Sequence, residues 1–237
     1  CIDERPAGVA GADGHVTGAE LVERCAWAKI EVVVADDPSE EQAVALDALA
    51  DSPDLEVVWT SERLGHAAAT NVGIRRAGGP VVILMDPSVE PTGDVVTPLV
   101  GVLEDPTVAV AGGWGITSSD LRAFEDASAG DVDAIEGYLM AFRRSDAGER
   151  GPLDERFRFY RNLDIWWSLV LRDAGEGEPH RRAVRVDVPA ERHAHRGWAS
   201  LPEEERARQS KRNFYRIIDR FGSRRDLLLH PGHAGKG

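Results

Sequence analysis

The chain has 237 residues, of which 42% are hydrophobic and six are tryptophan. This length and composition suit one folded α/β domain or two small ones, and they argue against a disordered chain. There are 28 Lys and Arg residues against 41 Asp and Glu, a net charge of −13, which argues against a general nucleic-acid-binding protein, because such proteins neutralise phosphates with a basic face.

Strand-like and helix-like segments alternate along the first half of the chain. The strand-like segments are short apolar runs, and the segments between them space apolar residues as amphipathic helices do. After an irregular stretch at 1–17, we predict a helix at 18–28, a strand at 29–35, a helix at 40–50, a strand at 55–60, a helix at 67–77, a strand at 81–85, a helix at 95–103 and a strand at 108–111. This alternation predicts a mostly parallel central sheet flanked by helices.

The second half of the chain has a different pattern. In order, we predict extended segments around Gly137 within 131–144, a helix at 162–174, a short strand at 185–188, a loop at 193–198 and a long terminal helix at 202–221. The stretches 112–135 and 145–152 carry no pattern that predicts an element. We see no linker between the halves, so we expect one domain spanning residues 1–237.

Carboxylates follow two of the predicted strands. Asp36 follows the strand at 29–35 and Asp86 the strand at 81–85, and open α/β sheets bind ligands at the carboxyl ends of their strands. Asp36 could accept hydrogen bonds from a nucleobase or a ribose. The alternative is a helix cap, with Asp37 or Ser39 capping the next helix, and for Asp36 we favour contact with a ligand.

Asp86-Pro87-Ser88 is a candidate site for a divalent cation. Mg²⁺ or Mn²⁺ that bridges a diphosphate takes oxygen ligands, typically one or two carboxylates together with phosphates and water. Asp86 would supply one carboxylate, Ser88 a neutral oxygen or a held water, and Glu90 a second carboxylate if the loop curls. A turn in which Asp86 binds backbone groups is the alternative, and for a lone aspartate it is the commoner arrangement.

Three further side chains are candidates for chemistry. Asp164 begins the predicted helix at 162–174, where a carboxylate is either a helix cap or a general base. His193 and His195 are separated by one residue and would point in opposite directions on an extended segment, so that one could bind a metal while the other faces away. A pair with this spacing is more often structural.

The predicted terminal helix mixes aromatic and basic residues between Arg212 and Phe221. We favour an amphipathic helix that packs on the domain and exposes its basic face. Contact with an acidic membrane surface, or with a second copy of the chain or another partner, is the alternative.

Taken in order, these segments resemble family 2 glycosyltransferases of the GT-A fold, from about Glu31 to about Trp198. VVVADDPS and GHAAATNVGIRRAGGPVVILMDPSVEP are similar to the family's strand ending in Asp, its Asn-x-Gly helix and its strand carrying an Asp-x-Asp motif. AIEGYLMAFRR and GPLDERFRFYRNLDIWWSLVLRDAG are similar to its acceptor-side segment and the helix that bears the catalytic base. The resemblance implies a GT-A-like single α/β domain with a nucleotide-sugar side at about 18–115, an acceptor side at about 116–200 and a C-terminal helix and tail at 201–237.

The resemblance also implies roles for individual residues. Donor binding is implied for Asp36, Asn71, Asp86 and Ser88. Binding of a metal or of the diphosphate is implied for Asp86 and for His193 or His195. Glu136 and Gly137 would border the acceptor pocket, and Asp164 would be the catalytic base. The chain departs from the family pattern at three points. The second Asp of the Asp-x-Asp motif is Ser88, the usual Glu-Asp pair is Leu163-Asp164, and residues 1–17 contain no evident first strand, which is either degenerate or upstream of a chain that begins at Cys1 without Met.

We therefore expect an inverting glycosyltransferase that moves a sugar from a nucleoside-diphosphate sugar to the hydroxyl of a glycan or lipid-linked acceptor, with Mg²⁺ or Mn²⁺, in the synthesis of a cell-surface glycan or glycolipid. Alternatives are a catalytically inactive protein that binds sugar nucleotides or serves as a scaffold, and a nucleotidyltransferase-like enzyme, against which the context of Asp164 argues. Two cysteines form no disulfide framework, and no apolar run reaches transmembrane length. We expect a cytoplasmic location, with the inner membrane face as a place of peripheral contact.

Overall fold

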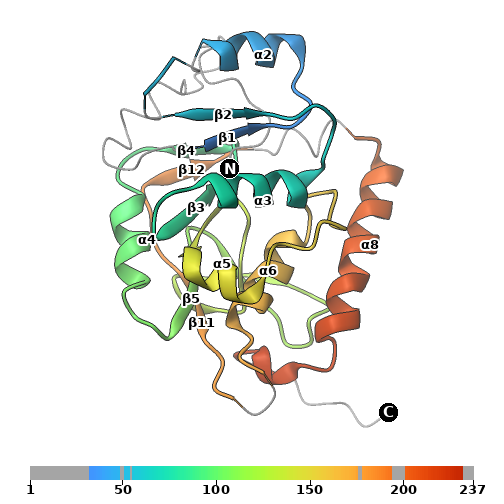
Figure 1. The fold of residues 1–237 in the computed structure, drawn as a ribbon. Coiled ribbons are helices and arrows are strands. Elements are labelled where there is room, and N and C mark those ends of the chain that lie inside the picture. The colour runs from blue at the N-terminus through green and yellow to red at the C-terminus, as the bar shows by residue number, and fades with distance from the viewer. Residues whose placement is uncertain (1–31, 49–50, 54, 176–177, 194–200, 232–237) are drawn as a thin grey trace.

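The computed structural model describes residues 32–48, 51–53, 55–175, 178–193 and 201–231 (Figure 1). The predicted helix at 18–28, the irregular stretch at 1–17 and His195 lie outside these residues. At the start of the described chain, β1 (Val32–Ala35) and β2 (Glu56–Trp59) form a parallel pair. All four residues of β1 are buried, as the apolar run predicted.

Two helices accompany this pair of strands. α2 (Glu40–Asp47) begins at Ser39, whose side chain and that of Gln42 form a reciprocal capping box. α3 (His66–Arg76) carries small residues on its inner side, which let it approach the sheets closely. Ala69 of α3 packs with Val32 and Val34 of β1, while Ala67 belongs to the main core. α3 therefore joins the β1–β2 pair to the rest of the molecule.

The central sheet has five strands in the order β3, β10, β5, β11 and β8. Their bounds are Val81–Met85, Leu139–Arg143, Val108–Gly112, Arg182–Arg185 and Gly130–Val132. β3, β5 and β11 run in one direction, whereas β10 and β8 run against them. The prediction of a mostly parallel sheet is corrected here to a mixed sheet, because β10 is inserted antiparallel between β3 and β5. Its segment was predicted only as extended.

Two smaller sheets lie beside the central one. β4 (Val89–Pro91) pairs antiparallel with β12 (Ala190–Arg192), and β6 (Gly115–Thr117) pairs with β7 (Glu125–Asp126) and β9 (Ala134–Ile135). The strand predicted at 185–188 is corrected: β11 ends at Arg185, and the chain then pairs again in β12. Several of these strands fall in 112–135, where two- and three-residue strands are too short to leave a periodic pattern.

Helices cover both faces of the central sheet. α4 (Val96–Val102) packs on one face, and α6 (Leu163–Arg172), α5 (Arg144–Arg150) and α8 (Glu203–Phe221) lie on the other (Figure 1). A short 3₁₀ helix, η1 (Arg225–Leu227), follows. β10 supplies both cores, because Met140 and Phe142 enter one and Leu139 and Ala141 the other. The Phe142 and Trp167 rings meet edge to face, 5.7 Å apart between centroids.

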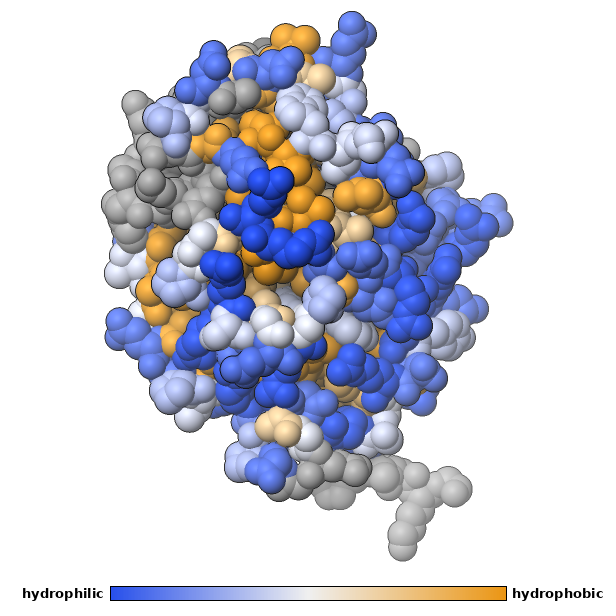
Figure 2. Space-filling view, in the orientation of Figure 1, coloured by the Kyte–Doolittle hydropathy of each residue, from blue (hydrophilic) through white to orange (hydrophobic). Residues whose placement is uncertain are grey.

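α8 packs on the domain as the favoured interpretation predicted. Ile217 and Phe221 enter the main core, and the Arg220 guanidinium lies 4.9 Å from the centroid of the Trp166 ring. Hydrophilic side chains dominate the outer surface on the side of α8, and the hydrophobic ones seen in this view gather mainly near β1 and β2 (Figure 2). No helix in the described part of the chain is long and apolar enough to cross a membrane.

The contact between β5 and the start of β10 has room only for glycine. A Cβ atom at Gly112 would lie 2.2 Å from Cγ2 of Ile135 and 2.5 Å from the backbone oxygen of Leu139. We therefore expect Gly112→Ala to lower the free energy of unfolding by about 1–3 kcal/mol through overpacking, measured by urea denaturation. Gly101→Ala is the matched control, because a Cβ there meets nothing within 4 Å and alanine is the better helix residue. Equal stability of the two variants would contradict the account.

Candidate functional site

The candidate site lies at one edge of the central sheet. Because β10 runs against its neighbours, it begins where β3 and β5 end. The backbone N–H of Asp86, just after β3, donates to the carbonyl of Tyr138 at 2.8 Å, and that of Gly113, just after β5, donates to Leu139 at 3.3 Å. Asp86, Trp114 and the turn at 136–138 therefore share this edge.

Arg192 reaches the same edge from β12. Its guanidinium donates to Oε2 of Glu136 at 2.7 Å and lies 5.7 and 5.2 Å from the ring centroids of Trp114 and Tyr138. These contacts combine an ion pair with two cation–π contacts, so they fix the direction in which Arg192 points. The Trp114 and Tyr138 rings themselves meet edge to face at 5.8 Å. The result is a partly exposed surface with an organised cation.

Asp164 faces this surface from the start of α6. It is the one residue of α6 that stays partly exposed, since the other nine positions of the helix are buried. Its Oδ2 accepts from the backbone N–H of Gly137 at 2.9 Å and its Oδ1 from that of Ile165 at 2.9 Å. A Cβ at Gly137 would lie 3.2 Å from Cβ of Asp164. Glycine at 137 therefore allows the turn before β10 to approach the carboxylate closely.

Burial raises the pKa of the Asp164 carboxyl above its ordinary value, although the amides of Gly137 and Ile165 and the charge of Arg161 act in the opposite direction. Burial also raises the pKa of Glu136, where the charge of Arg192 opposes the shift and that of Asp164 adds to it. A carboxyl group with a raised pKa takes up and releases a proton closer to neutral pH, which suits a general base.

Two tyrosines connect the carboxylates of the site. Burial raises the pKa of both Tyr138 and Tyr160, and the charge of Asp86 contributes to each shift. The charge of Asp164 acts on Tyr160 as well. Both phenols therefore stay protonated at neutral pH and can donate hydrogen bonds. Asp86 and Asp164 thus belong to one neighbourhood, although 78 positions in the chain separate them.

α8 holds the segment that leads into Asp164. Nδ2 of the buried Asn213 donates to the carbonyls of Phe159 and Arg161 at 2.9 and 2.8 Å, and Nδ2 of Asn162 donates to the carbonyl of Ser210 at 3.2 Å. Asn162 has a left-handed backbone with φ of 67°, a conformation that asparagine adopts more readily than most residues. The N-terminus of α6 is therefore positioned by α8 rather than by a capping side chain.

Asp86 and Ser88 form a tight turn after β3. Oδ1 of Asp86 accepts hydrogen bonds from both the backbone N–H and the hydroxyl of Ser88. Ser88 is 1% exposed, so its hydroxyl holds the turn in place. The half-buried Asp86 matches the turn interpretation of the sequence, and its position at the site edge also matches the interpretation as a ligand.

His193 reaches the same turn from the end of β12. Its backbone N–H donates to the carbonyl of Ser88 at 2.8 Å, while its Nε2 lies 3.0 Å from Oε2 of Glu90. The structure thus brings His193 beside Asp86-Pro87-Ser88, with its ring on Glu90. His195 is outside the described residues.

The described residues contain no group of three or more His, Cys, Asp or Glu side chains placed to hold a metal by themselves. A hard divalent cation shared with a substrate needs only one or two protein carboxylates, because phosphates and water complete its shell. Asp86 fits that arrangement. A metal held here would depend on a bound diphosphate for most of its ligands.

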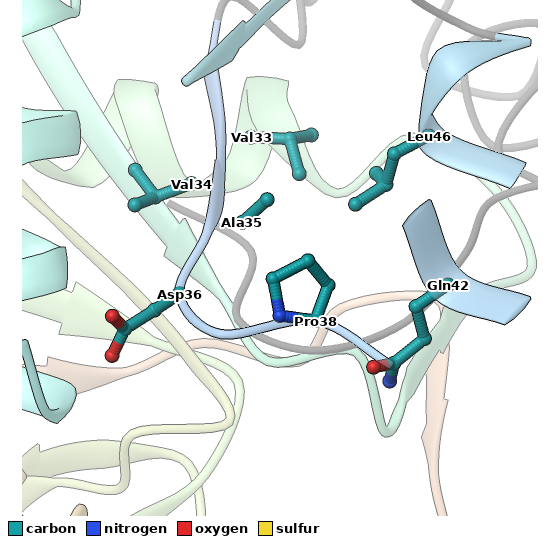
Figure 3. A pocket seen from close by; sticks show the side chains of 7 residues that line it. All are labelled: Val33, Val34, Ala35, Asp36, Pro38, Gln42 and Leu46. Carbon is teal, nitrogen blue, oxygen red and sulfur yellow. The ribbon is translucent and has the colours of Figure 1, made fainter. Parts of the chain in front are cut away.

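Asp36 is buried beneath the loop that follows β2. Its Oδ1 accepts from the Leu64 N–H at 2.7 Å and the Thr60 hydroxyl at 3.1 Å, and its Oδ2 accepts from the Gly65 N–H at 2.9 Å. Figure 3 shows its carboxylate pointing away from Gln42 and from the small hollow beside α2. That hollow has a volume of about 10 Å³, room for a water at most. The structure thus places Asp36 as an organiser of the loop at 60–65.

Asn71 lies inside the molecule and is 2% exposed. Its side chain accepts from the Leu153 N–H at 2.8 Å and donates to the Leu153 carbonyl at 2.9 Å and to Oε1 of Glu155 at 3.0 Å. It therefore ties α3 to the segment before α6. The family resemblance implied that Asn71 binds the donor. In the structure its side chain instead forms buried hydrogen bonds between α3 and the segment at 153–155.

Sequence analysis missed several residues of the site. Trp114, Tyr138, Tyr160 and Arg192 come from four separate segments. Trp114 follows the strand predicted at 108–111 after two glycines. This position near a strand end was the one feature of the sequence that could have indicated its place in the site. For Arg192 no sign was available, because only the pairing of β12 with β4 brings it to the edge.

Comparison with known families now identifies the chain. The family model described as "Glycosyl transferase family 2" matches residues 19–161. The chain belongs to glycosyl transferase family 2. No curated protein sequence was found to match it.

Three solved structures share the fold of this family 2 chain. GalNAc-T7, with UDP, GalNAc and Mn²⁺, matches 95% of this chain at 14% identity and a TM-score of 0.71, and the chain spans 49% of its length. The mannosyltransferase PcManGT from Pyrobaculum calidifontis, in complex with GDP-Man and Mn²⁺, matches 95% of this chain at 20% identity and a TM-score of 0.62. The chain spans 68% of its length. S. aureus TarS matches 92% of this chain at 10% identity and a TM-score of 0.51, and the chain spans 43% of its length. The predicted GT-A-like α/β fold is confirmed.

The three hydrogen bonds on Asp36 give a test of its role. Asp36→Ala leaves the Leu64 and Gly65 amides and the Thr60 hydroxyl without this acceptor, and we expect the free energy of unfolding to fall by about 2 kcal/mol or more, measured by urea denaturation. Asp47→Ala, at the exposed end of α2, is the control and should change stability by less than about 0.5 kcal/mol. If Asp36→Ala instead keeps full stability and weakens only nucleotide binding, Asp36 is a ligand contact.

Proposed function

We propose that this family 2 protein transfers a sugar from a nucleoside-diphosphate sugar to the hydroxyl of an acceptor, with Asp164 as the catalytic base. The observation that carries the proposal is the position of Asp164. It is the one residue of α6 that stays partly exposed, it is oriented by the amide of Gly137, and partial burial raises its pKa beside the sheet edge that holds Asp86. A carboxylate in these surroundings suits the removal of a hydroxyl proton.

The proposed reaction is a single inverting displacement. Asp164 takes the proton of the acceptor hydroxyl as that oxygen forms a bond to the anomeric carbon. The bond from this carbon to the diphosphate oxygen breaks on the opposite face, and the nucleoside diphosphate leaves with the electron pair. Positive groups near the leaving diphosphate favour this step, and Arg192, held between Trp114 and Tyr138, is the organised cation at the site edge.

A divalent cation is part of the proposal. GalNAc-T7 and PcManGT, which share the fold, carry Mn²⁺ with a nucleotide or sugar nucleotide. In this chain Asp86 is the carboxylate at the end of a central strand, where α/β sheets bind ligands. When bound, Mg²⁺ or Mn²⁺ would neutralise charge on the diphosphate. His193 and His195 stay predicted ligands, and the ring of His193 would first have to leave Glu90.

A second candidate function is binding of a sugar nucleotide without turnover. It is favoured by the replacement of the expected second carboxylate by Ser88, whose hydroxyl is buried against Asp86. The cytoplasmic location, the glycan or lipid-linked acceptor, the cell-surface pathway and contact of α8 with a membrane or a second chain also stay predictions.

Replacement of the base tests the mechanism. We expect Asp164→Asn to lower the rate of sugar transfer by about 10²–10⁴-fold, the usual contribution of a general base, with the affinity for the donor unchanged. Sugar-nucleotide hydrolysis and transfer assays give the rate, and isothermal titration with UDP, GDP and dTDP sugars gives the affinity. Glu149→Gln on the exposed end of α5 is the control. A loss of donor affinity equal to the loss of rate would make Asp164 a structural residue.

The pH profile gives an independent test. Only the ionised carboxylate accepts a proton, and burial raises the pKa of Asp164. We therefore expect the transfer rate to rise with pH through that raised pKa and to fall on the acid side, with a midpoint above the ordinary range of an aspartate. A rate that stays constant down to the ordinary aspartate pKa would exclude Asp164 as the base.

Asp86 gives the test for the metal. We expect Mn²⁺ to tighten nucleotide binding by the wild-type protein and to have no effect on Asp86→Ala, because the substituted side chain offers no oxygen ligand. Titration of nucleotide with and without Mn²⁺ measures both. Tightening that survives in Asp86→Ala would place the metal elsewhere, and absence of nucleotide binding by the wild type would refute both candidate functions.

A further inference from the structure

A groove of about 600 Å³ lies between α8 and the segments at 122–124 and 161–162. Its volume is within the range of ligand-binding sites, about 300–1,000 Å³. Its lining combines four cations with two aromatic side chains: Arg122, Arg161, Arg206 and Lys211 with Phe124 and Phe214. We call it the α8 groove.

The charge of the α8 groove is opposite to that of the chain. The sequence carries 13 more acidic than basic residues, yet the groove is lined by four cations and one carboxylate, Glu203. Arg122 and Lys211 are exposed, and the charge of Arg122 also acts on the neighbouring carboxylate of Asp120. The Lys211 ammonium lies 5.9 Å from the centroid of the Tyr215 ring. This concentration of positive charge in a concave surface favours a negatively charged ligand.

The α8 groove borders the segment that leads into the candidate site. Arg161 and Asn162 line the groove, and Asp164 is only two residues further along. The charge of Arg161 also acts on Asp164, Tyr138 and Tyr160. A ligand in the groove would thus contact the segment that carries Asp164 into α6.

The groove is also held in shape by the contacts that position Asp164. Asn213 of α8 binds the carbonyls of Phe159 and Arg161, and Asn162 binds that of Ser210. These hydrogen bonds fix one wall of the groove against the other. Phe124 and Phe214, both half-buried, add apolar surface on which the faces of sugar rings can pack.

We propose that the α8 groove binds the acceptor, and that this acceptor is an anionic glycan chain whose acidic groups pair with Arg122, Lys211 and their neighbours while a hydroxyl faces Asp164. This inference rests on the proposed transferase function, of which it names the acceptor class. Charge complementarity selects an anionic ligand, and the two phenylalanines favour a saccharide over a simple ion. The position next to Asp164 makes it the acceptor rather than the donor.

The test compares an anionic oligosaccharide with a neutral one. We expect tetragalacturonic acid to bind the wild-type chain, galactotetraose to bind more weakly, and added salt to weaken the first far more than the second. In the double variant Arg122→Gln/Lys211→Gln the dissociation constant for tetragalacturonic acid should rise about tenfold, since two exposed ion pairs are lost. Isothermal titration measures these values.

The control is Arg75→Gln/Arg150→Gln, which removes the same charge from exposed positions outside the groove and should leave the affinity unchanged. An equal loss of affinity in the two double variants would mean that binding depends on the net charge of the protein and not on the groove, and it would overturn the proposal. Equal affinity for the two oligosaccharides would also overturn the proposal.

Sedimentation with phosphatidylglycerol vesicles tests whether the groove binds a lipid surface instead. Binding of wild type but not of Arg122→Gln/Lys211→Gln would assign the groove to a lipid surface and overturn the glycan assignment.

The outcome separates this inference from the proposed function. Binding of UDP, GDP or dTDP sugars without any binding of tetragalacturonic acid would refute the anionic acceptor and leave the transferase intact. Binding of tetragalacturonic acid that depends on Arg122 and Lys211, without binding of any sugar nucleotide, would refute the transferase and the acceptor role.

Discussion

The insertion of β10 between β3 and β5 is the constraint on which the rest of the structure depends. Its alternate side chains fill the cores on both faces of the sheet, so its register cannot shift by one residue without exchanging the two sets. Its antiparallel direction places its first residues beside the last residues of β3 and β5. The turn at 136–138 is thereby held next to Asp86 and Asp164, and the absence of a side chain at Gly112 lets β5 approach closely.

Several polar residues that suit ligand binding are used to build the molecule. Asp36 organises the loop at 60–65, Asn71 joins α3 to the segment before α6, and the Ser88 hydroxyl closes the turn on Asp86. Buried polar groups need partners within the protein because water cannot reach them. The groups that the proposed chemistry would use are those at the sheet edge that stay accessible, chiefly Asp86, Asp164 and Arg192.

α8 connects the packing of the domain to the proposed chemistry. Its apolar residues Ile217 and Phe221 dock it on the core, its Asn213 holds the segment that carries Arg161 and leads to Asp164, and its basic residues line the α8 groove. One helix thus holds the segment before the proposed base and lines the groove next to that segment. Some of the basic residues of α8, for which contact with a membrane or a partner was the alternative interpretation, line a ligand-sized groove.

The sequence by itself determined the α/β class, the order of β1, α2, β2, α3, β3, α4 and β5, and the helices α6 and α8, because apolar periodicity and capping residues act locally. It also indicated Asp86 and Asp164 as side chains at element ends, where backbone direction alone places them near ligands. Only the tertiary structure decided the mixed sheet, the internal roles of Asp36 and Asn71, and the approach of Trp114, Tyr138 and Arg192 to one edge. These depend on pairings between distant segments, and strands as short as β4 and β12 leave no periodic pattern from which their partners could be predicted.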